Sequence, residues 1–180
     1  MPTGTLLFDM SAAMPADGTG TGNNPPAASP YVSFGTQTTN SPKVSSICWA
    51  FDPTTDEHVM WAFRMPENYS SGGTLILESA CVSDQGAAAE TIWKAALAAV
   101  TPGASENAFS KVFGTVATGT AVFNSIESGV VIQTSISPGL DSVVAGDHVC
   151  LFVGRDADHT MDDVTGDCML LSSGFEYTTT

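Results

Sequence analysis

The chain has 180 residues, of which 43% are apolar and 13% charged, a size and composition suited to one folded domain. Five basic residues against 19 acidic ones give a formal net charge of −14. A negative field of this kind repels phosphate backbones and anionic lipid headgroups, so we expect neither nucleic acid nor a membrane as a partner. The first residues also lack the basic start and apolar core of a secretory signal.

Residues 1–42 are predicted to form an extended N-terminal arm. Residues 10–42 consist mainly of Gly, Pro, Ser, Thr, Asn and Ala, which bury little surface and keep their backbone freedom. A short apolar strand is predicted near residues 5–9, ahead of this linker. Because the linker separates that strand from the rest of the chain, we expect it to have no nearby partner and to be free to pair with a neighbouring subunit.

Residues 43–180 are predicted to form one antiparallel β-sandwich. Short runs of β-branched and aromatic residues alternate with turn residues roughly every ten positions, which is typical of a sandwich or barrel. Residues 43–51 and 58–65 both show strand-like alternation, and the turn residues 52–56 between them predict a hairpin. Further strands are predicted at residues 74–82, 130–136, 148–155 and 168–177.

Residues 87–100 are ambiguous between a helix and a strand. Apolar residues recur at a spacing that fits a helix better than a strand. Gly86 and Pro102-Gly103 flank the segment, and strands are predicted on both sides of it, which keeps a strand at residues 91–100 open.

No catalytic, cofactor or metal site is predicted from the motifs of the chain, and we expect the protein not to be an enzyme. Nucleophile elbows, zinc-binding helices and phosphate-binding loops are all missing from the sequence. The default interpretation of His58, His148 and His159 is a surface or a hydrogen-bonded core position. Glu78 and Glu90 lie within strand patterns, but a glycosidase needs two carboxylates that face each other across a cleft.

The four cysteines and the three tryptophans are interpreted as core residues. No pair of cysteines has the spacing of a zinc knuckle, and each lies in an apolar segment, so buried free thiols are expected. Trp49 and Trp61 alternate with other apolar residues, as inward-facing side chains do. Trp93 is the one tryptophan for which an exposed position, as in a sugar-binding platform, stays open.

Residues 156–167 form the densest acidic segment of the chain. Closely spaced carboxylates are the ligands that Ca²⁺ prefers, so we compared this segment with an EF-hand loop. Met161 stands where that loop needs glycine, and Asp167 stands where it needs glutamate, which excludes an EF-hand. A looser calcium site and a plain solvated loop both stay open, with Arg155 as the internal counter-charge.

Seven short segments carry a resemblance to known proteins. They are FDPTTDE (51–57), FRMPENY (63–69), GG (72–73), IWK (92–94), AGD (145–147), VGRDA (153–157) and DVTGD (163–167), ahead of a final strand that ends at Tyr177. From residue 44 to residue 177 the chain resembles a family of phage-associated and metagenomic β-sandwich proteins that recur among virion structural genes. The resemblance also favours a strand at residues 91–100.

The resemblance implies a jelly-roll-like domain of a bacteriophage capsid decoration, cement or fibre protein. Such a protein is located on the capsid surface of the virion, is often a homotrimer, and is anchored to the major capsid protein or to neighbouring virion subunits through an N-terminal arm. The family brings no catalytic residues. The alternative is a tail or fibre module that binds a receptor glycan, which an exposed Trp93 would favour.

Overall fold

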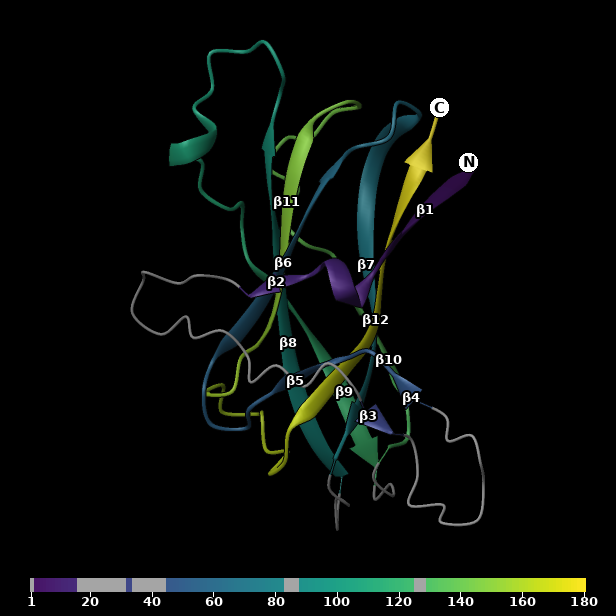
Figure 1. The fold of residues 1–180 in the computed structure, drawn as a ribbon, viewed down its shortest axis with the longest axis vertical. Helices are drawn as coiled ribbons and strands as arrows, with labels where there is room; N and C mark the ends of the chain where they lie inside the picture. The colour runs from purple at the N-terminus through teal and green to yellow at the C-terminus, as the bar shows by residue number, and fades with distance from the viewer. Residues whose placement is uncertain (1, 16–31, 34–44, 83–87, 125–128) are drawn as a thin grey trace.

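The computed structural model describes residues 2–15, 32–33, 45–82, 88–124 and 129–180. Two antiparallel sheets pack face to face (Figure 1). The first sheet contains β1 (Thr3–Phe8), β5 (Trp49–Phe51), β7 (Tyr69–Cys81), β10 (Ile132–Ile136) and β12 (Cys168–Thr179). The second contains β2 (Met14–Pro15), β6 (Glu57–Arg64), β8 (Ala88–Val100), β9 (Ala117–Asn124) and β11 (His148–Arg155).

The smaller elements lie outside these two sheets. A separate two-stranded sheet pairs β3 (Val32–Ser33) with β4 (Ser45–Ser46). The 3₁₀ turn η1 (Met10–Ala12) lies between β1 and β2, and η2 (Ala108–Ser110) lies in the β8–β9 loop.

The strand order is that of a jelly roll. From β5 onward the chain gives one sheet in the order β5-β12-β7-β10 and a second in the order β6-β11-β8-β9. From β5 to β12, successive strands lie in opposite sheets, except that β8 and β9 are neighbours in the second sheet. This is the arrangement of two interlocked Greek keys. The predicted all-β antiparallel sandwich is confirmed.

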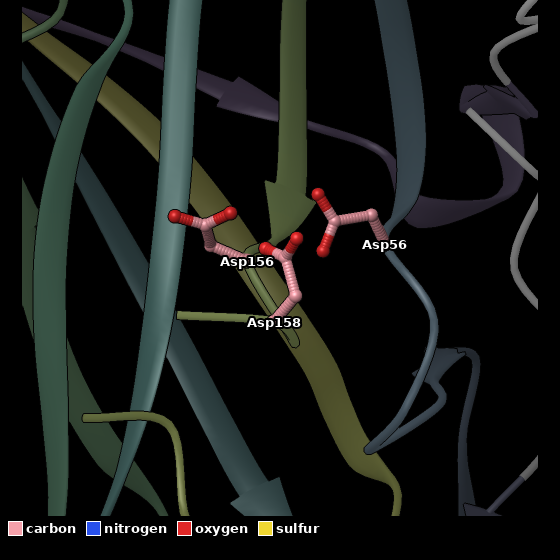
Figure 2. A group of neighbouring side chains, drawn as sticks. All are labelled: Asp56, Asp156 and Asp158. Carbon is pink, nitrogen blue, oxygen red and sulfur yellow. The ribbon is translucent and has the colours of Figure 1, made fainter. Parts of the chain in front are cut away.

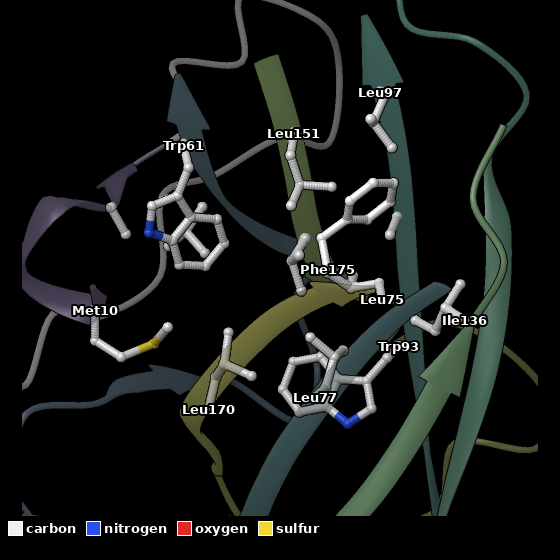
Figure 3. Close-up of a cluster of buried hydrophobic side chains, with 14 of the residues drawn as sticks. Met10, Trp61, Leu75, Leu77, Trp93, Leu97, Ile136, Leu151, Leu170 and Phe175 are labelled. Atoms are coloured by element: carbon white, nitrogen blue, oxygen red, sulfur yellow. The ribbon is translucent and has the colours of Figure 1, made fainter. Parts of the chain in front are cut away.

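The core lies between the two sheets and is built by alternation along each strand. In the second sheet Leu151 lies opposite Trp61 on one side and Leu97 on the other, and all three side chains point inward. Phe175 and Leu75, which are opposite each other in the first sheet, meet them from the other layer (Figure 3). Burial of such side chains contributes roughly 25 cal/mol per Å² of apolar surface, so this layer is a main source of stability.

The predicted hairpin of residues 43–51 with 58–65 is wrong. β5 pairs with β12 in the first sheet, whereas β6 pairs with β11 in the second. The connection between β5 and β6 therefore crosses from one sheet to the other. It is shaped by Asp52, whose carboxylate accepts a hydrogen bond from the Thr54 backbone N–H at 2.7 Å, while Glu57 accepts one from the Asp52 N–H at 2.8 Å. Alternation identified the two strands correctly, but it does not specify the partner of either.

The prediction that the strand near residues 5–9 has no partner in its own chain is also wrong. β1 pairs with β12 along six residues, from Thr3 opposite Thr178 to Phe8 opposite Ser173. β5 covers only the start of the same edge of β12, so β1 continues the ladder where β5 stops. Of the rest of the predicted arm, the structure describes residues 9–15 and 32–33, and the remainder lies outside the described residues.

The N-terminal segment crosses from the first sheet to the second. After β1, the carbonyl of Asp9 accepts a hydrogen bond from the Trp61 indole at 2.9 Å, and the carbonyl of Met10 accepts one from the Trp49 indole at 2.8 Å. β2 then joins the edge of β6. Trp49 belongs to the first sheet and Trp61 to the second, so residues 3–15 close one side of the sandwich. Within this segment, the side chain of Met10 is buried in the core.

Residues 88–100 form a strand, β8, as the resemblance favoured. Its alanines give it a helical propensity, and their spacing resembles a helix because both faces of the strand are covered. Leu97 faces the core, and on the opposite face Ala96 and Ala98 are buried too. A strand buried on both faces loses its alternation, which is why the periodicity was ambiguous. Strands β7, β10, β11 and β12 confirm the other predictions; β9 was not predicted.

Candidate functional site

The candidate site is a groove on the outer face of the second sheet, the face turned away from the core. Alternation along β6, β8 and β11 places His58, Met60, Lys94 and Phe152 on this face. The groove has a volume of about 510 Å³, within the range of pockets that take a ligand. The β8–β9 loop and the loop after β11 complete its lining with Phe113, Gly114, Val116 and Asp156.

A glycine in β11 fixes the position of the histidine. His58, Gly154 and Lys94 form one row across three neighbouring strands. A Cβ atom at Gly154 would lie 2.5 Å from Cδ2 of His58, so only a glycine there lets the imidazole lie over β11. The ring then packs edge-on against Phe152, with 5.4 Å between the ring centroids.

His58 is a buried histidine with an unsatisfied nitrogen. Its side chain is 6% exposed, and its Nδ1 atom makes no hydrogen bond. Burial, and to a smaller extent the nearby Lys94 ammonium, lowers the pKa of His58 from its usual 6.5 to about 4, against the opposing effect of Asp56 and Asp156. The imidazole is therefore neutral at pH 7. The prediction of a satisfied or surface histidine is wrong at this position.

Three carboxylates gather around Asp156, which lines one end of the groove. Asp56 comes from the β5–β6 connection, and Asp156 and Asp158 come from the loop after β11 (Figure 2). We call these three residues the aspartate cluster. One oxygen of each lies within 4.8 Å of the others. Asp56 and Asp158 are 102 positions apart, and no pattern in the sequence indicates that they lie close together.

The Lys94 ammonium already occupies the aspartate cluster. It forms ion pairs with Asp56 and, at 3.1 Å, with Asp156, and the second oxygen of Asp56 accepts a hydrogen bond from the Ala157 N–H at 2.8 Å. The spacing of the carboxylates matches the reach of a Ca²⁺ ion, whose ligand oxygens lie about 2.4 Å from it. A metal ion would have to displace Lys94, so the arrangement fits an internal ammonium better than calcium. Asp158 is exposed and has no ion pair among the described residues.

Arg155 acts as the internal counter-charge of the acidic loop, as predicted. Its guanidinium and the carboxylate of Asp162 are both fully buried and lie 2.6 Å apart. It also donates hydrogen bonds to the carbonyls of Val164 at 2.7 Å and Gly166 at 2.9 Å. Asp162 additionally accepts the Ile92 N–H at 2.9 Å, so this network holds the loop against β8. It is closed and offers no free group to a ligand.

The remaining residues of interest are not brought together. Glu78 lies on β7 and hydrogen-bonds the Ser172 hydroxyl at 2.7 Å, whereas Glu90 lies on β8 in the other sheet. His148 is exposed at the start of β11, and the Nδ1 atom of His159 accepts the Met161 N–H at 3.2 Å within the acidic loop. None of these four residues lines the groove.

Trp93 is fully buried and packs edge-on against Phe51, with 5.1 Å between their ring centroids. It therefore gives no support to a glycan-binding platform. The cysteines are free thiols, as expected; Cys48, Cys81 and Cys168 are buried and Cys150 is half-buried.

Neither a protein-family model nor a curated protein sequence matches the chain. In the part of the chain that the structure describes, no helix is long and apolar enough to cross a membrane.

Proposed function

We propose that the protein is a virion structural protein that decorates or cements a phage capsid. The observation that carries the proposal is the jelly-roll strand order, since this architecture recurs in viral capsid proteins. The architecture also occurs in lectins and other proteins, and a fold does not by itself imply a function. The segments that resemble virion proteins therefore supply the second support.

Those segments converge in the fold. FDPTTDE contributes Asp56, IWK contributes Lys94, and VGRDA contributes Arg155 and Asp156. DVTGD contributes the carbonyls of Val164 and Gly166, so four of the segments meet around Lys94 and Arg155. Their shared role is to join loops to strands by ion pairs and hydrogen bonds.

The edge strand β1 supports a protein that functions in an assembly. β1 pairs with β12 on one side, and no other described strand pairs with its second side. It carries no charged residue, and Leu7 is 85% exposed. Soluble proteins protect such edges with charges, prolines or a covering element. A neighbouring subunit of a trimer, or a capsid protein, would cover this edge by adding a strand to it.

Attachment is proposed through the N-terminal part of the chain, as in the arm-anchored proteins that it resembles. Because residues 3–15 belong to the sandwich, removal of residues 1–42 would damage the fold as well as the anchor. A single substitution on the free edge of β1 is therefore the better test. Leu7→Lys places a charge on the edge without touching the core, and Val144→Lys is the matched control, because Val144 is 49% exposed in a loop before β11.

The experiment combines mass photometry of the purified chain with co-sedimentation on phage capsids stripped of their decoration proteins. The wild type and Val144→Lys are expected to form the same oligomer and to pellet with capsids, whereas Leu7→Lys stays monomeric or remains in the supernatant. Thermal melting checks that all three are folded. A wild-type chain that remains monomeric and fails to pellet with capsids would overturn the proposal.

A further inference from the structure

The wall of the groove exposes a run of apolar side chains to water. Two of its lining residues, Val116 and Phe113, are 50% and 36% exposed. Val112, next to Phe113 in the same β8–β9 loop, is 75% exposed. The loop is not loose here, because the N–H of Gly114 donates to the carbonyl of Leu97 at 2.8 Å. Phe113 also packs edge-on against Phe152 in the groove, with 4.9 Å between ring centroids. Apolar side chains held in contact with water in this way mark an interaction surface.

The acidic end of the groove carries uncompensated negative charge. The aspartate cluster has three carboxylates, and Lys94 supplies one ammonium, so two formal negative charges are left. His58 is neutral at pH 7 and adds no positive charge. Asp158 lies beside the groove rather than in its lining, with a carboxylate oxygen within 4.8 Å of one of Asp156. It is the exposed member of the cluster and has no ion pair among the described residues, so it can receive a cationic group.

His58 supplies a third, independent feature. It lines the same groove as Lys94 and Asp156, it is 6% exposed, and its Nδ1 atom lacks a hydrogen-bond partner. Buried polar atoms are normally hydrogen-bonded, so an unpartnered one on the lining of a cavity is available to a bound partner. The neutral ring offers one nitrogen as a donor and the other as an acceptor.

We propose that this groove binds a segment of a partner protein in which a lysine or arginine lies beside apolar residues. The basic side chain would pair with Asp158 at the acidic end, and the apolar residues would pack against Phe113 and Val116. Charge complementarity decides this occupant, because the groove combines an apolar wall with negative charge in a chain of net charge −14. The inference rests on the proposed function, in which the partner is a capsid protein or a neighbouring virion subunit.

Two other occupants fit less well. A divalent cation would have to displace Lys94 from Asp56 and Asp156. A glycan would need an exposed aromatic platform, and Trp93 is buried in the core. A cation alone would also leave the apolar wall uncovered.

The test is fluorescence anisotropy with the full-length chain and labelled twelve-residue peptides. The probe alternates lysine with leucine; one control peptide replaces every lysine with glutamate, and another replaces every leucine with serine. We expect the probe to bind and both control peptides to bind at least about tenfold more weakly. The first control peptide lacks the positive charge that pairs with the aspartates, and the second lacks the apolar side chains that pack against the wall of the groove. Equal binding of the probe and the lysine–serine peptide would show charge attraction alone and would overturn the proposal.

Variants locate the binding on the chain. Asp158→Asn is expected to weaken binding of the probe by about twofold to fivefold, as for the loss of an exposed ion pair, and Phe113→Ser by about tenfold. The matched controls are Glu176→Gln, an exposed acid on β12, and Val131→Ser, a 48% exposed residue ahead of β10. If the control variants weaken binding as much as the groove variants do, the groove is not the site.

Two further measurements separate the alternatives. Calcium chloride at constant ionic strength is expected not to displace the probe, and displacement at micromolar calcium would identify the aspartate cluster as a metal site instead. The peptide assay contains no capsids, so its failure leaves the capsid proposal standing. Conversely, if peptides bind in the groove but the chain does not bind capsids, the groove stands as a binding site and the proposed virion role is wrong.

Discussion

The guanidinium of Arg155 lies 2.6 Å from the carboxylate of Asp162, and both side chains are completely shielded from water. Removal of one partner of a buried ion pair leaves an uncompensated charge, which typically costs about 3–5 kcal/mol. We expect Asp162→Asn to lower the free energy of unfolding in urea by about that amount. Asp158→Asn, four residues earlier and exposed, should stay within about 0.5 kcal/mol of the wild type. Similar losses for both variants would contradict a buried pair.

The N-terminal segment is expected to contribute to stability through Met10. Met10 is 5% exposed, and its carbonyl and that of Asp9 accept the hydrogen bonds of the two tryptophans. Leu7 on β1, by contrast, is 85% exposed. Met10→Ala should therefore lower the free energy of unfolding by about 2–3 kcal/mol, as large-to-small core substitutions do. Leu7→Ala is the control and should change it by less than about 0.5 kcal/mol. If Met10→Ala changes the free energy of unfolding as little as Leu7→Ala does, residues 3–15 do not pack on the sandwich as described.

Stability is expected to decrease between pH 7 and pH 4 because of His58. Its pKa is about 4 in the folded chain and 6.5 when exposed, so the unfolded chain takes up a proton first as the pH falls. The free energy of unfolding therefore decreases from pH 6.5 downward and levels off below pH 4, by up to about 3 kcal/mol from this group.

Carboxylates also titrate in this range, so the effect of His58 must be measured as a difference. His58→Gln keeps a polar side chain but does not titrate. The pH profile of the wild type minus that of His58→Gln, from urea unfolding at a series of pH values, should slope as described. A flat difference would mean that His58 is accessible to protons in the folded chain.

The buried cysteines are expected to be unreactive in the folded protein. Burial raises the pKa of Cys48 and Cys168 to about 11, and only the thiolate attacks a disulfide reagent. Ellman's reagent at pH 8 should therefore label the folded chain slowly, and at Cys150 if at all, because that thiol is half-buried. Four thiols should react in urea. Rapid labelling of the folded Cys150→Ser variant would contradict the burial of the other three.

Local pattern predicted most of the strands but few of their partners. Alternation was sufficient for β6, where Val59 and Trp61 face the core, and turn residues marked the ends of β11 and β12. It failed for pairing: Leu6 lies opposite Phe175, and nothing within residues 1–42 indicates that contact. It also left β8 ambiguous, because both faces of this strand are buried and the alternation of apolar and polar residues is lost.

The candidate site was even less visible in the sequence. The acidic loop and the charge of Arg155 were apparent, and so was the possibility of a cation near residues 156–167. The partner of Asp156, however, is Lys94 from β8, joined by Asp56 from the β5–β6 connection. The row of His58, Gly154 and Lys94 exists only because β11 lies between β6 and β8.

The sequence by itself determined the all-β class, the strong negative charge and the identity of most core residues, because these depend on composition and on a period of two along each strand. Only the tertiary structure decided the jelly-roll order, the docking of β1 on β12 and the assembly of the groove. The physical reason is that β pairing is long-range: a strand's side-chain pattern states which face is buried but not which edge it meets. Stability of the whole sandwich selects among the possible edges, so the groove is a consequence of the fold.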